Sequence, residues 1–377
     1  MSVSIQDHEF MARAISLAKQ GKFTTSPNPN VGCVVVKDQK IIAEGWHKKA
    51  GTGHAEVNAF SQLSNEQAQN ATAYVTLEPC SHFGRTPPCA KLLIKSGVAR
   101  VVVAMVDPNP SVAGNGISML KNAGIAVDVG VLEQDARALN LGFLSRMEYK
   151  KPFVQVKLAS SLDGKTALEN GDSKWITGAQ ARGDVQKYRA QSCAILSTAK
   201  TVLADDAALN VRANEIKFSY PIDEINPTIR QPIKIILDSQ NKINRQNFKQ
   251  LRLFLDNARI ILIRQNLTNE FSDIENVTEA LIKYDNGFDL TELLNWIATQ
   301  EVNHLWVEAG ANLAASFVQQ QLFDQLICYV APKIMGENAQ GMLPIGPFNS
   351  MDDVVQLDLN QVTQLGNDLK LVYSKQD

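Results

Sequence analysis

The spacing of hydrophobic positions alternates between two periods along the first 150 residues. Apolar side chains at helical spacing run from Phe10 to Ala18, with Ser4 as a candidate N-cap and Gly21 beyond the end. Short apolar runs at 31–36, 41–46, 73–77 and 101–105 predict strands. The same patterns predict helices at 90–95, 117–123 and 133–146 and a strand at 125–129. Strands that alternate with helices predict a three-layer α/β domain.

A polar, proline-bearing break follows this region at Tyr149-Lys-Lys-Pro152. A chain of 377 residues exceeds what one hydrophobic core usually holds, so we place a domain boundary here and predict domains at 1–149 and 150–377. The second half alternates again, with strands expected at 153–158, 194–196, 233–237, 259–263 and 304–308 and helices at 180–190 and from 312. Residues 214–231 show little periodicity and predict a surface excursion.

Composition narrows the class of protein. The formal net charge is −2 and no long run of Lys and Arg occurs, which argues against non-specific nucleic-acid binding but leaves small anionic ligands open. The mixed N-terminus is not a secretory signal, and no stretch of about 18 apolar residues predicts a membrane span. Five cysteines in a chain of this length do not suggest a disulfide framework, so we expect a cytoplasmic protein with no membrane partner.

Three residues form a candidate zinc site: His54, Cys80 and Cys89. Imidazole and thiolate ligands suit zinc, and three protein ligands leave the fourth tetrahedral position open for water, as in catalytic sites. Zinc lowers the pKa of such a water to about 7. The sequence therefore predicts a hydrolytic zinc centre.

Glu56 is the candidate proton carrier of that centre, because a deaminase must take a proton from water and pass one to the departing ammonia. Residues two apart on a regular helix do not share a face, so His54 and Glu56 can converge only at a helix start. Gly51 and Gly53 favour a loop before such a helix. We likewise expect the thiolates of Cys80 and Cys89 near a second helix N-terminus, whose free amides stabilise them.

Simpler interpretations remain open at this stage. The two cysteines could be free thiols, Glu56 could be a solvated helix charge, and His82 could be a fourth ligand that makes the site structural. Cys33 lies in an apolar run and is expected to be a buried packing residue.

The H-x-E and P-C…C residues resemble the cytidine-deaminase-like family, with one departure. Eight residues separate Cys80 from Cys89, where most members have two. The insertion Ser81-His-Phe-Gly-Arg-Thr-Pro-Pro88 is similar to that of the bifunctional riboflavin-biosynthesis deaminase–reductase family. Further motifs that resemble this family, and that cover nearly the whole chain, are Pro27-Asn-Pro-Asn-Val-Gly-Cys33, His54-Ala-Glu-Val57, Thr76-Leu-Glu-Pro-Cys-Ser-His82, Asp107-Pro-Asn-Pro110, Lys157-Leu-Ala-Ser-Ser-Leu-Asp-Gly164, Trp175-Ile-Thr177, Val202-Leu-Ala-Asp-Asp206 and Trp306-Val-Glu-Ala-Gly310.

The resemblance implies a cytidine-deaminase-like three-layer domain followed by a dihydrofolate-reductase-like α/β domain. It implies two reactions of flavin synthesis: zinc-dependent deamination of a diaminopyrimidinone ribosylamine 5′-phosphate, then reduction of the ribosyl chain to ribityl by NADPH. A homodimer is expected from the family.

The resemblance also implies site residues. Those implied for NADPH are Ala159, Trp175, Thr201, Asp205, Ser239, Gly310, Ala311, Asn312, Leu313, Ala314, Ala315 and Ser316. Those implied for the substrate are Asn28, Ser173, Arg189, Leu209, Arg212 and Glu308. His82 and Arg85 of the insertion are further substrate candidates, and Lys157 and Asp163 are candidates for the proton donor of the reduction.

The residues themselves allow plainer roles in the second half. No G-x-G-x-x-G follows a strand, although Gly310 lies between a predicted strand and helix, where backbone amides can approach a pyrophosphate. Trp175 could be a core residue, Arg189 a helix-surface charge, and Asp205 a turn cap. The two arginines and Ser173 could hold the 5′-phosphate, Arg by bidentate bonds.

Two other functions share parts of this pattern. A nucleic-acid base deaminase has the same zinc chemistry, but the neutral charge and large second domain argue against it. Alternatively, the second half could be a ligand-binding module that regulates the deaminase.

Overall fold

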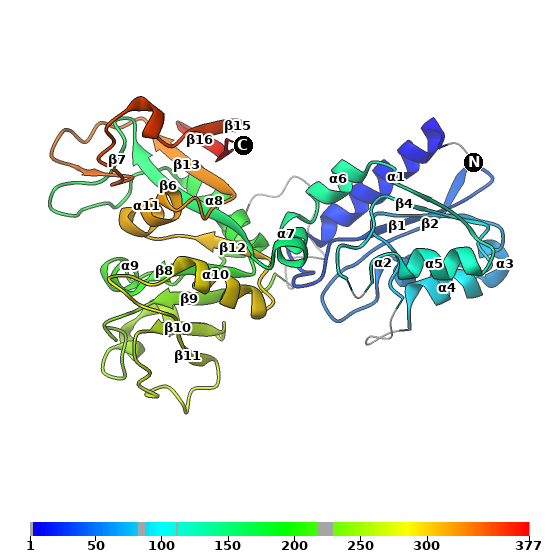
Figure 1. The fold of residues 1–377 in the computed structure, drawn as a ribbon, viewed down its shortest axis with the longest axis horizontal. Helices are drawn as coiled ribbons and strands as arrows, with labels where there is room; N and C mark the ends of the chain where they lie inside the picture. The colour runs from blue at the N-terminus through cyan, green and yellow to red at the C-terminus, as the bar shows by residue number, and fades with distance from the viewer. Residues whose placement is uncertain (1–2, 82–86, 111, 217–228, 377) are drawn as a thin grey trace. The chain divides into compact units, whose positions relative to one another are not determined.

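The computed structural model describes residues 3–81, 87–110, 112–216 and 229–376 (Figure 1). The chain separates into two compact units, Met1–Lys151 and Pro152–Asp377. Each unit is built on a sheet of its own.

The first unit contains a five-stranded sheet of order β2-β1-β3-β4-β5. Its strands are β1 Gly32–Lys37, β2 Lys40–Trp46, β3 Thr72–Val75, β4 Arg100–Val103 and β5 Ala126–Val129. Strand β1 pairs antiparallel with β2 and β3, whereas β3, β4 and β5 are parallel. The parallel strands β3 and β4 are almost entirely buried, as expected for strands covered on both faces.

Helices cover both faces of this sheet. One face packs against α1 Ile5–Ala18, α6 Glu133–Ala138 and α7 Leu141–Tyr149, and the other against α2 Ala55–Phe60, α4 Cys89–Lys95 and α5 Asn115–Asn122. A short helix, α3 Asn65–Ala68, precedes β3. The prediction of a three-layer α/β domain is confirmed.

Local signals in the sequence explain most of these boundaries, with one error. Ser4 caps α1 through a capping box with Asp7, as its position predicted. The single helix predicted at 133–146 is wrong, because the chain forms α6 and α7 with a break at Asn140. The buried Asn140 side chain accepts a hydrogen bond from the backbone of Asn30 at 2.7 Å and donates one back at 2.9 Å. This pairing interrupts the helix.

The second unit contains a nine-stranded sheet of order β11-β10-β9-β8-β12-β6-β13-β16-β15. Its strands are β6 Phe153–Ser161, β8 Ala194–Thr198, β9 Ile233–Leu237, β10 Ile260–Arg264, β11 Val277–Leu281, β12 His304–Val307, β13 Gln325–Ala331, β15 Leu357–Leu365 and β16 Asp368–Lys375. The strands from β11 to β13 are parallel, and β16 and β15 continue the sheet antiparallel. Strands β7 Lys165–Ala167 and β14 Gln340–Gly341 form a separate ribbon.

Two hydrophobic clusters cover the two faces of this sheet. One includes side chains of α10 Leu290–Thr299 and α11 Ala311–Gln319, and the other includes side chains of α8 Ala179–Gln191 and α9 Ala199–Asp205. The predicted strands and helices of this half are present, within a few residues. Among residues 3–81, 87–110, 112–216 and 229–376, no helix is long and apolar enough to cross a membrane.

Candidate functional sites

The candidate zinc ligands converge at the starts of two helices in the first unit. His54 is the N-cap of α2, and Cys89 is the first residue of α4. The backbone N–H of Cys89 donates to the sulfur of Cys80 at 3.3 Å. The predicted placement at helix starts is therefore confirmed. The amide of Cys89 has no partner within its own helix, so it is free to stabilise negative charge on Cys80.

The distances within this cluster suit one small metal ion. His54 Nδ1 lies 3.3 Å from the sulfur of Cys89 and 3.6 Å from that of Cys80. A tetrahedral zinc with its usual bond lengths holds ligand atoms about 3.3–3.8 Å apart. The hydrogen bonds with Cys89 and His54, outweighing burial, lower the pKa of the Cys80 thiol to about 4. The donor set, its spacing and its low-pKa thiol all fit zinc.

Glu56 lies beside this cluster and is buried, with 3% of its surface exposed. It belongs to the first turn of α2, two residues after His54. Burial raises the pKa of Glu56 to about 7, and the nearby negative charge of Cys80 adds to the rise. The alternative that Glu56 is a solvated helix charge is thus wrong. A bound zinc dication would lower this pKa again, because its charge acts on every group around it.

Asn28, a predicted substrate-binding residue, is held by a histidine that sequence reasoning missed. The Nδ2 of Asn28 lies 3.1 Å from Nε2 of His47, and Nδ1 of His47 lies 3.0 Å from the carbonyl oxygen of Gly53. An amide nitrogen only donates, so Nε2 accepts and Nδ1 carries the proton that His47 gives to Gly53. Burial lowers the pKa of His47, which keeps this ring neutral. The arrangement leaves Oδ1 of Asn28 as an acceptor for substrate.

Replacing His47 with alanine is expected to raise KM for the deaminase substrate about 10-fold, because the amide of Asn28 loses the bond that orients it. Steady-state kinetics of ammonia release measures this effect. Zinc content is the control, because His47 contributes no metal ligand in this arrangement. An unchanged KM would show that Asn28 needs no support from His47.

Glu78 is a second residue that the sequence did not identify as important. Its buried carboxylate accepts four backbone N–H groups from residues 107–117, at 2.9–3.2 Å. A Cβ atom at Gly116 would lie 1.9 Å from the carbonyl oxygen of Pro79, so the start of α5 packs directly against the segment that leads to Cys80. Glu78 thus fixes the backbone beside one zinc ligand.

In the second unit, the predicted substrate residues Arg189 and Glu308 pair with each other. Nε and Nη2 of Arg189 donate to the two carboxylate oxygens of Glu308 at 2.9 and 2.7 Å, while Nη1 donates to the carbonyl of Asn210 at 2.8 Å. The indole of Trp306 donates to the same carboxylate at 3.0 Å. Arg189 is 8% exposed, so the alternative that it is a helix-surface charge is wrong.

This pairing keeps Glu308 ionised. Burial alone would raise the pKa of Glu308, but the charges of Arg189 and Lys157, with hydrogen bonds from Arg189 and Trp306, lower it to about 2. Asp163, by contrast, accepts hydrogen bonds from the hydroxyl of Ser161 and from the backbone N–H groups of residues 335–336. These bonds, the one from Ser161 foremost, lower its pKa to about 2. Of the two proton-donor candidates, Asp163 is therefore ionised at neutral pH and has no proton to donate.

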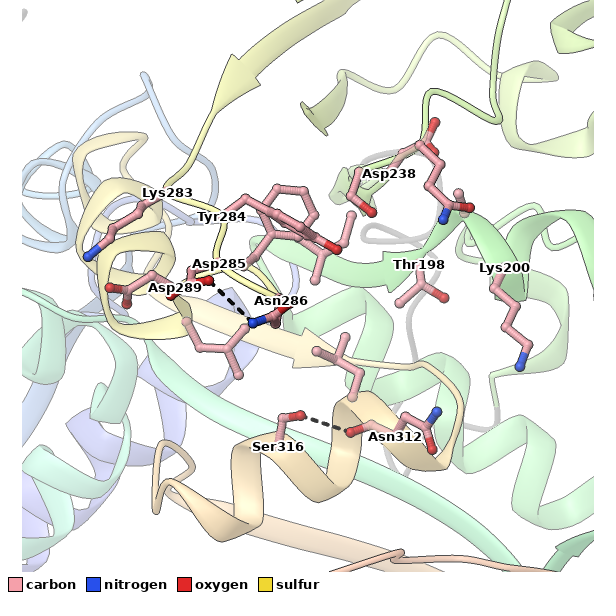
Figure 2. Close-up of a pocket in the computed structure, with 18 of the residues that line it drawn as sticks. Thr198, Lys200, Asp238, Lys283, Tyr284, Asp285, Asn286, Asp289, Asn312 and Ser316 are labelled. Atoms are coloured by element: carbon pink, nitrogen blue, oxygen red, sulfur yellow. Dashed lines mark hydrogen bonds between the residues drawn. The ribbon is translucent and has the colours of Figure 1, made fainter. Parts of the chain in front are cut away.

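A cavity of about 840 Å³ lies at the carboxyl ends of β8, β9 and β12. In parallel sheets this edge is where ligands usually bind. Figure 2 shows α11 with Asn312 and Ser316 along one wall, and Asp238 and Tyr284 across from them. The first backbone amides of α11, after the extended residue Gly310, offer donors to an anion. Four predicted cofactor residues line this cavity: Ser239, Asn312, Leu313 and Ser316.

The other predicted cofactor residues do not line the cavity. Gly310 and Ala311 begin α11, and Ala314 and Ala315 are buried within it. Ala159 is in β6, and Thr201 and Asp205 are in α9. Trp175 is 67% exposed, with the guanidinium of Arg182 4.6 Å from its ring centre, so its alternative role as a core residue is wrong.

The remaining predicted substrate residues differ in exposure. Ser173 and Arg212 are half-buried, and Arg212 pairs with Glu215 at the surface. The side chain of Leu209 is buried in the core of the sheet. His82 and Arg85 lie outside the described residues.

Comparison with known proteins accounts for both units. The family model for the cytidine and deoxycytidylate deaminase zinc-binding region matches residues 4–105. The model for the RibD C-terminal domain matches residues 152–371. The first match lies within the first unit, and the second spans nearly all of the second.

Relatives match the whole chain as well. Riboflavin biosynthesis protein RibD of Haemophilus influenzae is 47% identical over 374 residues, 99% of each chain. The Escherichia coli K12 protein of that name is 46% identical and covers 97% of this chain and 99% of its own. The solved structure of Acinetobacter baumannii RibD, form 1, superposes with a TM-score of 0.90 at 43% identity over 99% of each chain. A solved structure from Thermotoga maritima has a TM-score of 0.84 at 34% identity and covers 98% of this chain and 99% of its own. That protein is a diaminohydroxyphosphoribosylaminopyrimidine deaminase/5-amino-6-(5-phosphoribosylamino)uracil reductase.

Proposed function

Because the chain belongs to the RibD family of riboflavin-biosynthesis enzymes, we propose that residues 1–149 carry the deamination and residues 150–377 the reduction. The chain is a bifunctional enzyme, a zinc-dependent deaminase and an NADPH-dependent reductase acting on a pyrimidine ribosylamine phosphate. The predicted fold of a cytidine-deaminase-like domain followed by a reductase domain is confirmed.

In the deaminase unit, His54, Cys80 and Cys89 would hold the zinc and Glu56 would move the proton. Bound there, zinc supplies Lewis-acid activation of a water molecule. The carboxylate of Glu56 accepts a proton from the attacking water and donates it to the amine that leaves as ammonia. Its burial at the start of α2, beside the three ligands, supports this role because it keeps the exchange away from bulk water. Asn28 holds the pyrimidine through Oδ1.

In the reductase unit, the cavity beside α11 would bind NADPH, which supplies the hydride. The protein's part is to align the nicotinamide with the sugar carbon that receives the hydride. Glu308, fixed by Arg189 and Trp306, is an ionised acceptor for substrate hydroxyl or amine groups. Lys157 is the better candidate for protonating the opened sugar, and the more exposed Arg212 is the better one for the 5′-phosphate.

The observation that carries this proposal is the joint presence of a three-ligand metal cluster with a buried carboxylate and of a separate cofactor-sized cavity in one chain. A nucleic-acid base deaminase explains only the first, and a regulatory module does not account for the match of residues 152–371 to the RibD C-terminal domain. We further propose a cytoplasmic homodimer that needs no nucleic acid; light scattering tests its mass.

A coupled assay with metal analysis on the same sample tests both activities. Cys89→Ser is expected to bind less than about a tenth of the zinc bound by the wild type and to lose deamination, while NADPH oxidation with the deaminated intermediate continues. Cys193→Ser is the matched control, because Cys193 is buried in the second unit. If the wild type, loaded with zinc, releases no ammonia from the diaminopyrimidinone substrate, the deaminase assignment fails. If it does not oxidise NADPH, the reductase assignment fails.

A further inference from the structure

The cofactor-binding residues predicted for this chain include no lysine and no arginine. NADPH differs from NADH by a monophosphate on the 2′-oxygen of the adenosine ribose. A phosphate is usually bound by Lys or Arg through charge-assisted hydrogen bonds. Cationic groups that recognise the 2′-phosphate are therefore to be sought among the other residues of the cavity.

Three lysines line the cavity beside α11: Lys200, Lys242 and Lys283. Within the described part of the chain, none of their ammonium groups has a hydrogen-bond or ion-pair partner. All three residues are exposed, so a ligand can reach them without displacing a protein contact.

The carboxylates of the same cavity do not neutralise these lysines. Asp238 forms a buried ion pair with Arg264 and accepts two backbone N–H groups from residues 242–243. Asp289 caps α10, where it accepts the backbone N–H of Glu292 at 3.0 Å. Asp285 is exposed and accepts from the amide of Asn286. The cavity therefore keeps positive charge available for an anion.

Strand order determines where the adenosine part of the cofactor would lie. In the proposed placement the nicotinamide would extend toward Glu308, which follows β12, and the amides at the start of α11 would face the pyrophosphate. Strand β8 lies between β12 and β9, so the cofactor extends toward the ends of β8 and β9. Thr198 and Leu237 are paired at the ends of these two parallel strands. Lys200 follows the end of β8, and residues 239–242 follow the end of β9.

Two of the three lysines, Lys200 and Lys283, point in different directions. Figure 2 shows Lys200 extending along the wall that also carries Thr198 and Asn312. The amino group of Lys283, on the opposite side, points away from these residues. Lys283 is therefore a matched control on the same cavity.

We propose that Lys200 and Lys242 bind the 2′-phosphate of NADPH and thereby select NADPH over NADH. The inference rests on the proposed placement of the cofactor in this cavity. Each ammonium donates a charge-assisted hydrogen bond to a phosphate oxygen that NADH lacks. Ser239, which lines the same cavity, can donate a third bond from its hydroxyl.

Direct binding tests this inference without relying on turnover. Calorimetric titrations would use the full-length protein with NADPH, NADH and 2′,5′-ADP, comparing the wild type with Lys200→Gln, Lys242→Gln, the double variant and Lys283→Gln. The double variant is expected to bind NADPH and 2′,5′-ADP about 10- to 100-fold more weakly, with its affinity for NADH within about 3-fold of the wild type. Lys200→Arg should retain most of the affinity, and Lys283→Gln should change none of the constants by more than about 3-fold.

The other outcomes overturn the inference in distinguishable ways. Equal losses for NADPH and NADH would assign the two lysines to the pyrophosphate. An unchanged affinity for NADPH, or the same loss in Lys283→Gln, would exclude specific recognition by Lys200 and Lys242. A wild type that binds neither nucleotide would refute the proposed reductase function as well, whereas the first two outcomes leave it standing.

Discussion

Glu56→Gln is expected to lower kcat for deamination about 10²- to 10⁴-fold, the usual effect of losing a general acid–base group. The amide keeps the size of the side chain, so the buried site at the start of α2 stays packed, but it cannot accept and return a proton. Zinc content should be unchanged, because Glu56 is not one of the three ligands. NADPH oxidation with the deaminated intermediate should also proceed at the rate of the wild type.

Parallel measurements of ammonia release, bound zinc and NADPH oxidation check this prediction. Glu66→Gln is a suitable control, since Glu66 is an exposed carboxylate on α3 of the same unit. Deamination within a few-fold of the wild type in Glu56→Gln would remove Glu56 from the proton transfer. Loss of zinc would instead indicate a structural role.

Arg189→Ala is expected to destabilise the second unit by about 3 kcal/mol and to abolish most of the reduction. The substitution leaves the carboxylate of Glu308 buried without its bidentate partner, so the pKa of Glu308 rises from about 2. In the wild type the folded-state pKa lies below the unfolded value. The pair therefore stabilises the fold above about pH 4.5, and this stability is lost as the pH falls toward 2. The variant should lack this part of the pH dependence.

Urea unfolding at several pH values, with reductase kinetics at neutral pH, measures both effects. Arg212→Ala provides the comparison, because its ion pair with Glu215 is more than a third exposed and contributes little stability. Arg212→Ala should raise KM for the phosphorylated substrate with nearly normal unfolding. If Arg189→Ala behaves in the same way, Arg189 binds substrate directly rather than holding Glu308.

Local patterns were sufficient to predict the zinc cluster. The H-x-E spacing required a helix start, and His54 is the N-cap of α2. The proline before Cys89 marked a second helix, and α4 begins at that residue. Such features depend on a few neighbouring residues, so local sequence signals for helix starts can detect them.

Contacts between distant segments could not be predicted in this way. Arg189 and Glu308 are 119 residues apart and meet because β12 inserts between β8 and β6, an order that no local pattern encodes. The pairing of His47 with Asn28 depends likewise on the register of the first sheet. Helix α9, which has seven residues, was not predicted.

The reciprocal hydrogen bonds between Asn140 and Asn30 have a consequence for the size of an independent deaminase. They tie the last two helices to the turn that carries Asn28, and α6 and α7 complete one of the two cores of the sheet. The family model ends at residue 105, before these helices. A fragment cut at that point would keep every zinc ligand. The turn that carries Asn28 would, however, lose its hydrogen bonds with Asn140, and the sheet would expose apolar surface to water. The smallest competent deaminase therefore extends at least to Asn140, which lies beyond the residues that match the zinc-binding family model.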